Sequence, residues 1–201
     1  MKKGLLIVMS GPSGSGKSTI NTLVREMNKN IVKSVSVTTR PPRTGEEDGV
    51  HYFFKTEDEY RQMIADGAFL ETAAVYTNYY GTPKSRVFEL LDKGFDVLLE
   101  IDTIGAMQVR RAHPESILIF IMPPSMTELE RRLRERDTES DDAVRIRLRA
   151  AKREMSKVGA YDYVVENDTP LAAAQTLLDI VTAERCAVRR NAQEIANILN
   201  N

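Results

Sequence analysis

The sequence of 201 residues contains one cysteine, Cys186, and can therefore form no internal disulfide bond. Such cysteine usage is typical of a reducing compartment, and we expect a cytoplasmic location. No stretch approaches the roughly 20 consecutive apolar residues of a membrane-spanning helix. A short apolar run follows Met1–Lys3 but leads into a glycine-rich segment, which favours a buried strand over a secretion signal. We therefore expect no membrane partner.

The chain also lacks an excess of charge of either sign. Its 28 Lys and Arg residues nearly balance 29 Asp and Glu residues, which leaves a formal net charge of −1. No overall positive field would attract nucleic acid, so we expect no such partner and look for local anion-binding arrangements instead. The two histidines, His51 and His113, have no partner at metal-ligand spacing. Composition otherwise fits a soluble globular domain, with 42% hydrophobic residues.

Short apolar runs alternate with helical patterns along most of the chain. Unbroken apolar runs favour strands that are covered on both faces, and their alternation with helices predicts an α/β fold with a parallel sheet flanked by helices. The expected strands are residues 5–9, 35–37, 97–101, 117–122 and 163–165. The expected helices are residues 18–27, 103–112, 125–136 and 171–199.

Two regions interrupt this alternation. Residues 36–93 are rich in Tyr, Phe and Thr and predict an inserted mixed α/β lobe, with short strands at 51–54, 69–75 and 79–80 and a helix at 57–65. Residues 125–157 predict a helical lid of two helices joined at 137–141. We expect a single domain of 1–201 whose core comprises residues 1–35, 94–124 and 158–201, as a monomer or homodimer.

A phosphate-binding loop is the strongest motif in the chain. The pattern G-x-x-x-x-G-K-[ST] follows an apolar strand and opens a helix, which is the context that the motif requires. Backbone N–H groups of such a loop cradle phosphates, its lysine reaches the β- and γ-phosphates, and its hydroxyl is offered to Mg²⁺. The expected ATP-binding residues are Gly11, Pro12, Ser13, Gly14, Ser15, Gly16, Lys17, Ser18 and Thr19.

The inserted lobe carries a second set of chemical groups. Arg40 and Arg43 flank a Pro-Pro turn, and arginine forks suit bidentate phosphate binding. Tyr52 could add a hydroxyl to the same anion, and Glu71 follows an apolar pair. The segment then continues with N-Y-Y-G-T at residues 78–82.

These segments together resemble the guanylate kinase family of P-loop nucleoside monophosphate kinases, from about residue 4 to residue 187. The T-T-R-x-P-R-x-G-E segment at 38–46, its G-x-x-Y-x-F continuation and the N-Y-Y-G sequence are specific to that family. The resemblance implies ATP-dependent phosphorylation of GMP, and also dGMP, to GDP in purine nucleotide metabolism, with Mg²⁺. It also implies that ATP and GMP are the small-molecule partners.

The resemblance also implies roles for individual residues. Glu71 should accept hydrogen bonds from guanine N1–H and the 2-amino group, while Thr82 should donate to O6. Lys17, Asp102, Arg136 and Arg147 are expected to be catalytic, with Arg132 a weaker candidate. Ser18 should bind Mg²⁺, and Asp102 should do so through a water molecule. The remaining GMP-binding residues implied are Ser36, Arg40, Arg43, Tyr52, Tyr80, Glu100 and Asp102.

Three positions depart from the expected family pattern. Glu100 stands where the family usually has Asp, and Ile104 occupies a position where Gln is commoner. Asp137 follows Arg136 where glycine is usual. These departures bear on efficiency more than on identity.

Two alternatives remain open on the sequence. One is an inactive interaction module, and such modules typically have a degraded phosphate loop, whereas Gly16, Lys17 and Ser18 are intact. The other is a kinase for a different nucleoside monophosphate, for which Glu71 and Thr82 are the discriminating residues.

Overall fold

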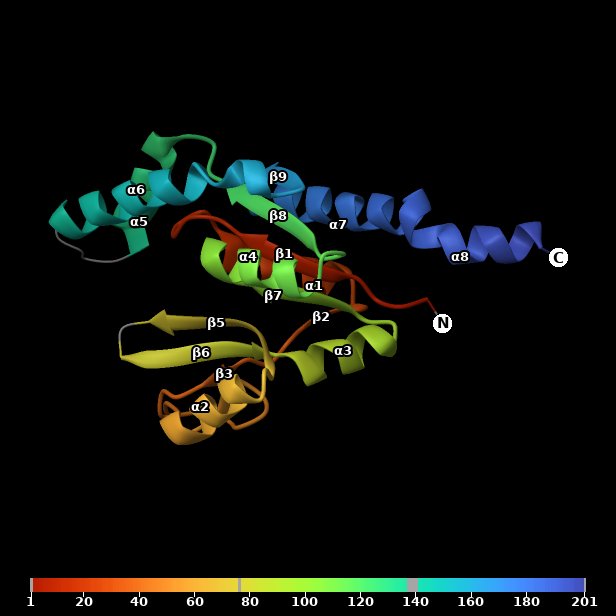
Figure 1. Ribbon diagram of the computed structural model, residues 1–201. Coiled ribbons are helices and arrows are strands. Elements are labelled where there is room, and N and C mark those ends of the chain that lie inside the picture. The colour runs from red at the N-terminus through yellow and green to blue at the C-terminus, as the bar shows by residue number, and fades with distance from the viewer. Residues whose placement is uncertain (1, 76, 137–140, 201) are drawn as a thin grey trace.

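The computed structural model describes residues 2–75, 77–136 and 141–200. Its core is a five-stranded sheet in the order β2-β7-β1-β8-β9, and every pairing is parallel. The strands are β1 (Leu6–Ser10), β2 (Ile31–Lys33), β7 (Asp96–Glu100), β8 (Ile117–Met122) and β9 (Tyr163–Glu166). Figure 1 shows this sheet at the centre of the molecule, with helices on both faces. The predicted α/β fold with a parallel sheet is confirmed.

Alternate side chains of β1 build the two halves of the hydrophobic core. Ile7 and Met9 pack with apolar residues of α1 (Lys17–Met27) and α7 (Pro170–Cys186) on one face of the sheet. Leu6 and Val8 pack with residues of α3 (Lys84–Asp92) and α4 (Thr103–Ala112) on the other. Because both faces are covered, the strand reads as an unbroken apolar run.

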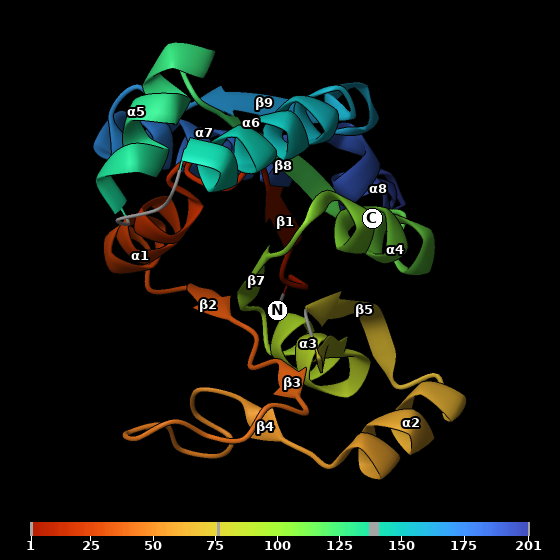
Figure 2. The same ribbon diagram turned by 90° about the vertical axis from the view of Figure 1, so that its left-hand side faces the viewer.

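A second, four-stranded sheet forms the inserted lobe, in the order β4-β3-β6-β5. Its strands are β3 (Val37–Thr38), β4 (Phe53–Phe54), β5 (Phe69–Val75) and β6 (Asn78–Pro83). Helix α2 (Glu57–Ala65) begins with a capping box between Thr56 and Glu59 and buries Tyr60 against Val37 and Phe69. Figures 1 and 2 place this lobe on the opposite side of the core sheet from α5 (Met126–Arg136) and α6 (Asp141–Met155).

Helices α5 and α6 pack on each other through an apolar edge. Leu129, Leu133 and Ala151 are buried there, with Leu148 partly buried beside them. This matches the helical pair expected for residues 125–157; its joint at residues 137–140 lies outside the described residues. A short 3₁₀ helix, η1 (Val158–Ala160), leads from α6 to β9.

The second core strand differs from the sequence prediction. Residues 35–37 were expected to form it, but β2 spans Ile31–Lys33, and Val37 belongs to the small sheet. Ile31 is buried with the core, whereas Val37 is buried against Tyr60 and Phe69 in the lobe. Both segments are short and apolar, so periodicity alone cannot assign each of them to its sheet.

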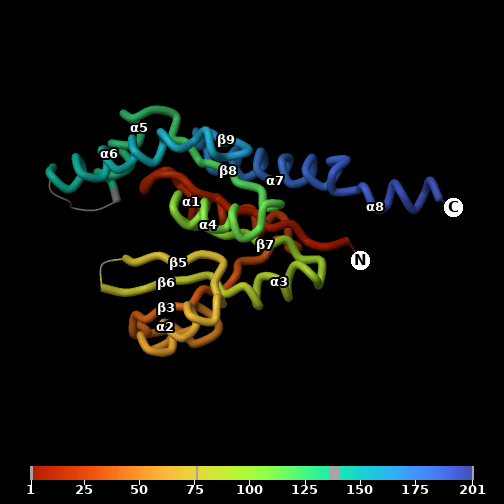
Figure 3. Tube along the Cα trace, in the orientation of Figure 1, coloured from red at the N-terminus to blue at the C-terminus, as the bar shows by residue number. Residues whose placement is uncertain are grey.

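The final helix was predicted as one element and is two. Ala187 adopts an extended conformation between α7 and α8 (Val188–Leu199), which the tube in Figure 3 shows continuing to the C-terminus. Past this break, Arg189 and Arg190 turn back to the buried carboxylate of Glu184. The Asn191 side chain also donates to the carbonyl of Ala187 at 2.9 Å. These bonds stabilise the break, which has no glycine or proline to mark it.

Helix α3 was not predicted. Its buried residues Val87 and Leu91 are four apart and contact the core sheet, a helical spacing that the sequence does contain.

Candidate functional site

The phosphate loop connects the carboxyl end of β1 to the amino end of α1. Gly16 has a φ of 88°, and a Cβ there would lie 2.2 Å from Nδ2 of Asn167. Only glycine therefore fits, because a side chain would be strained and would clash. Asn167 is itself buried and donates to the carbonyl of Ser15 at 2.7 Å, which holds the loop from the far end of β9. Sequence reasoning gave Asn167 no such supporting role.

The predicted ATP-binding residues occupy this loop and the first turn of α1. Nζ of Lys17 donates to the carbonyl oxygens of Gly11 and Pro12 at 2.6 and 2.9 Å, so the ammonium lies over the loop. Gly11, Pro12 and Ser15 are buried, whereas Ser13, Ser18 and Thr19 are exposed. Lys17, Ser13 and Ser18 line one hollow beside the loop.

Two carboxylates lie at the end of β7, next to the loop. Ser18 Oγ donates to Glu100 Oε1 at 2.7 Å, and Asn21 donates to Glu100 Oε2 at 3.0 Å. Asp102 caps α4 by accepting from the backbone N–H groups of Ile104 and Gly105 at 2.9 and 2.7 Å. Both carboxylates are therefore fixed beside the phosphate loop.

A hollow of about 380 Å³ is lined by the loop, the two carboxylates and Glu154 of α6. Burial raises the pKa of Glu154, and the nearby Lys17 opposes that rise. The lid thus contributes a carboxylate to the same hollow. Sequence reasoning missed Glu154, because only the packing of α6 brings it to the loop.

The strands β5 and β6 place a buried polar pair in the lobe. Glu71 and Thr82 are register partners, with exposed fractions of 5% and 1%. Thr82 Oγ1 donates to Glu71 Oε1 at 2.6 Å. Burial raises the pKa of Glu71, and the bond from Thr82 opposes this effect. The structure thus brings together the two residues that the resemblance assigned to the base.

A cluster of Arg40, Tyr52 and Tyr80 lies near the meeting point of β3, β4 and β6, and Tyr80 stands two residues before Thr82 in β6. The rings of Tyr52 and Tyr80 meet edge to face with centroids 6.0 Å apart, and the Arg40 guanidinium lies 5.7 Å from the Tyr52 ring. The backbone carbonyl of Ser36 accepts from the N–H of Phe53, the residue after Tyr52, at 2.8 Å. The backbone N–H of Arg43 lies nearby, while its side chain is exposed.

Glu46 organises this cluster and was missed in the sequence. Both of its oxygens accept from Arg40, at 2.8 and 2.9 Å, and Oε2 also accepts from Arg43 N–H at 2.8 Å. Hydrogen bonding from the Arg43 backbone and from Arg40 lowers the pKa of Glu46. A carboxylate thus lies where two arginines are expected to bind phosphate. Glu46 is the last residue of the T-T-R-x-P-R-x-G-E segment, so the sequence did mark it, but the segment alone indicates no role for this carboxylate.

The lid arginines fall into two groups. Arg131 and Arg134 pair with carboxylates of their own helices, as expected of surface residues. Arg132 bonds Glu128 and the carbonyl oxygens of Asn167 and Asp168, so it ties α5 to the loop after β9. Arg147 is half-buried in α6. The side chain of Arg136 and the residue Asp137 lie outside the described residues.

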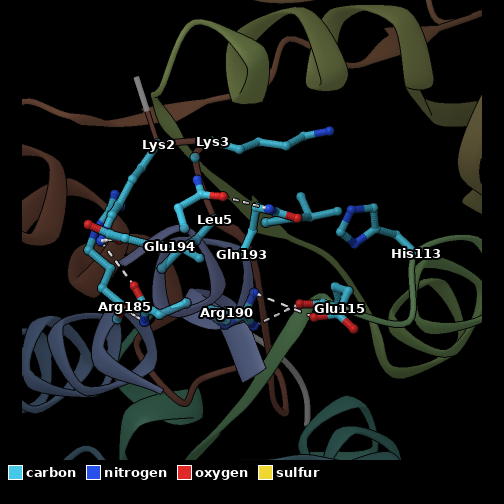
Figure 4. Close-up of a pocket in the computed structure, with 13 residues that line it drawn as sticks. Lys2, Lys3, Leu5, His113, Glu115, Arg185, Arg190, Gln193 and Glu194 are labelled. Atoms are coloured by element: carbon cyan, nitrogen blue, oxygen red, sulfur yellow. Dashed lines mark hydrogen bonds and ion pairs between the residues drawn. The ribbon is translucent and has the colours of Figure 1, made fainter. Parts of the chain in front are cut away.

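A larger hollow of about 790 Å³ opens at the amino end of β1, away from the phosphate loop. Figure 4 shows its lining by the N-terminal lysines, His113 and residues of α7 and α8. Its cations have acidic partners: Lys2 pairs with Glu194, and Arg185 with Asp96. None of the predicted site residues lines it.

Comparison with known proteins agrees with these features. The family model for guanylate kinase matches residues 3–184. The guanylate kinase of Caldanaerobacter subterraneus is 50% identical over 94% of this chain and 92% of its own length. That of Bacillus subtilis is 48% identical over 98% of both chains. This chain belongs to the guanylate kinase family.

A solved structure extends the family likeness to three dimensions. The crystal structure of guanylate kinase from Anaplasma phagocytophilum superposes with a TM-score of 0.73 at 36% identity, covering 96% of this chain and 94% of that one. Within the part of the chain that the structure describes, no helix is long and apolar enough to cross a membrane. The family match ends within α7, so all of α8 lies beyond it.

Proposed function

We propose that this chain transfers the γ-phosphoryl group of ATP to GMP, and also to dGMP, producing ADP and a guanosine diphosphate. Membership of the guanylate kinase family supports the reaction. The observation that supports GMP as the phosphoryl acceptor is the buried pair of Glu71 and Thr82 in the lobe. A cytoplasmic location, which the single cysteine favours, is part of the proposal.

The buried pair suits guanine and rejects adenine. The ionised Glu71 can accept from N1–H and the 2-amino group of guanine, and the Thr82 hydroxyl can turn to donate to O6. Adenine presents a bare N1 acceptor and no 2-amino donor, so the base would donate no hydrogen bond to the buried Glu71. Because a buried carboxylate with unsatisfied acceptor positions costs more than a lost contact, such a site discriminates by several orders of magnitude.

The phosphate of GMP is assigned to the cluster around Arg40, with Ser36, Arg43, Tyr52 and Tyr80. Nη2 of Arg40 already donates to both oxygens of the Glu46 carboxylate, so this guanidinium can hold an anion, and a phosphate is an anion with similar acceptor oxygens. At neutral pH this phosphate is an anion, so its oxygen is a nucleophile without a strong general base. The task of the protein is therefore to align two polyanions and offset their charge.

Lys17 and the lid arginines are assigned to the transferring group. Lys17 sits on the phosphate loop, and Arg147 comes from the half-buried face of α6. Arg136, at the end of α5, is assigned with Arg147 on the family resemblance. The proposed division into a core (1–35, 94–124 and 158–201), an acceptor lobe (36–93) and a lid (125–157) follows from these roles.

The oxygen donors beside the loop fit Mg²⁺. The Ser18 hydroxyl, Asp102 and Glu100 offer hard oxygen ligands next to the phosphate loop, and Mg²⁺ prefers one or two such ligands together with phosphate oxygens and waters. Ser18 would hold the ion directly and Asp102 through water, while Glu100 orients the Ser18 hydroxyl. When bound, the ion offsets negative charge on the β- and γ-phosphates.

Replacing Glu71 with Gln tests the acceptor assignment. Gln is neutral, and where Glu71 offers two acceptor oxygens it offers one oxygen and one N–H₂ group, which would face a guanine donor. The kcat/KM for GMP should therefore fall by about 10²-fold or more. The KM for ATP should change by less than about twofold, because the phosphate loop is untouched. Glu57→Gln, an exposed residue of α2, is the matched control. Undiminished GMP turnover in Glu71→Gln would disprove the base assignment.

A further inference from the structure

The side chain of Gln108 joins the core to the acceptor lobe. Gln108 lies on α4, and its Oε1 accepts from the backbone N–H of Thr72 in β5 at 2.9 Å. Its Nε2 donates to the carbonyl of the same residue at 3.0 Å. One primary amide therefore satisfies both backbone groups of Thr72, as a residue of a neighbouring strand would do.

Strand β5 needs such a partner because it is the last strand of the small sheet. The order β4-β3-β6-β5 pairs β5 with β6 on one side only. An edge strand presents unpaired N–H and C=O groups on its other side. Because the amide contacts both groups of one residue, it fixes the position of α4 along the strand as well as across it.

Thr72 follows Glu71 directly in β5, so the bonds that hold the Thr72 backbone also hold the backbone of Glu71. Glu71 also meets α4 directly, since a Cβ on Gly105 would lie 3.0 Å from Glu71 Oε2. Gly105 and Gln108 are three residues apart and share one face of the helix. Helix α4 therefore approaches β5 at two points about one turn apart, one at the Glu71 carboxylate and one at the Thr72 backbone.

The same helix is attached to the phosphate loop at its other end. Asp102 caps α4, and Ser10 Oγ at the end of β1 donates to the Asp102 carbonyl at 3.3 Å. A continuous path of bonds thus runs from the strand before the phosphate loop, through α4 and Gln108, to the backbone next to Glu71. We expect this path to determine the distance between the guanine base and the phosphate loop.

We propose that Gln108 is a positioning residue for the acceptor nucleotide. It holds β5 in register with α4, so that the Glu71 carboxylate meets the guanine edge while the GMP phosphate faces the phosphate loop. This inference rests on the proposed function, in which Glu71 reads the base. Gln108 itself need not touch either substrate.

The test compares GMP with IMP, which lacks only the 2-amino group. In Gln108→Leu, a side chain of similar size without hydrogen bonds, the KM for GMP should rise about tenfold. The preference for GMP over IMP should fall by about the same factor, since a displaced Glu71 gains less from the 2-amino group. The KM for ATP should stay within about twofold. Gln108→Asn, which is one methylene too short to reach both groups, serves as a second variant that keeps the amide.

A matched control and a direct probe separate positioning from general destabilisation. Gln175 is an exposed residue of α7 whose amide bonds Asp179, so Gln175→Leu removes a comparable hydrogen bond without touching the lobe. Amide hydrogen exchange at Thr72 reports the Gln108 bond itself. Exchange there should accelerate in both Gln108 variants and not in Gln175→Leu.

Two results would overturn the inference. If the Thr72 amide keeps its protection in Gln108→Leu, the bond does not form in solution. If protection is lost while the GMP to IMP preference is unchanged, Gln108 has a structural role only. Glu71→Gln is measured alongside: a lost preference there with an intact preference in Gln108→Leu rejects positioning but keeps the base site. An intact preference in Glu71→Gln rejects the base site, and the positioning role with it.

Discussion

At the scale of single residues, the proposed acceptor site contains a buried acid. Glu71 has an exposed fraction of 5%, and its described hydrogen-bonding side-chain partner is a hydroxyl rather than a cation. Burial without a counter-charge favours the protonated form, so ionised Glu71 destabilises the empty lobe as the pH rises through its raised pKa. In the proposed complex, the N1–H and 2-amino donors of guanine offset the cost of ionising Glu71. The cost in the empty protein thus becomes a preference for a ligand that brings these two donors.

This reasoning predicts the pH dependence of GMP binding. Only ionised Glu71 can accept from both guanine donors, and its pKa in the empty protein lies above the ordinary carboxyl value of 4.5. The KM for GMP should therefore rise on acidification at a pH higher than an exposed carboxylate would produce. Steady-state KM values for GMP and ATP across pH 5 to 8 check this, with Glu71→Gln as the reference. The acid limb for GMP should disappear in that variant, and its persistence would assign the titration to another group.

At the scale of elements, the junction of α7 and α8 is held by a buried carboxylate. Glu184 is 4% exposed and binds Tyr163, Arg189 and Arg190. In Glu184→Ala, two arginines and a tyrosine hydroxyl lose this partner, and breaking a buried ion pair costs about 3 kcal/mol. For a chain of this size, that lowers Tm by about 6–12 °C. Turnover of GMP should be unchanged, because the junction is remote from the phosphate loop.

Thermal unfolding of Glu184→Ala and of a surface control checks this prediction. Glu57 pairs with Arg61 on the exposed side of α2, and such pairs contribute less than about 1 kcal/mol. Glu57→Ala should therefore shift Tm much less. Equal shifts in the two variants would show that the Glu184 network does not stabilise the junction.

The same junction illustrates what the sequence could and could not predict. The phosphate loop and the core strands other than β2 were predictable because they depend on local spacing and continuous apolar runs. The break at Ala187 was not, since it depends on Glu184 being buried and on arginines that follow it. The core strand predicted at residues 35–37 is wrong for a similar reason: residues 31–33 and 37–38 are both short segments whose strand partners lie far along the chain.

The candidate site shows the same limit. Lys17, Arg40 and Glu71 stand in segments whose residue order alone identifies them. Glu154 and Gln108 stand in ordinary helical sequence, and their partners are distant: 36 residues separate Gln108 from Thr72. Asn167 meets the phosphate loop across 152 residues. Only the packed structure could reveal these supporting residues.

At the scale of the whole molecule, the lobe and the lid lie on either side of the carboxyl end of the core sheet. Strands β5 and β6 project on one side of the carboxyl end of β1, and α5 and α6 lie on the other (Figures 1 and 2). The proposed acceptor and donor sites therefore face a common space beside the phosphate loop. Movement of lobe and lid toward each other would exclude water, which would otherwise hydrolyse ATP. Transfer should accordingly depend on both substrates being present.

The most direct test is ADP formation from ATP and Mg²⁺, measured with GMP, AMP, CMP and UMP supplied separately and with no acceptor. The account predicts strong turnover with GMP, at least about 10²-fold weaker turnover with each other monophosphate, and a similarly low rate without acceptor. Preference for a different monophosphate would contradict the assignment of Glu71 and Thr82. Equal rates with and without GMP would contradict the claim that this fold transfers phosphate to GMP rather than to water.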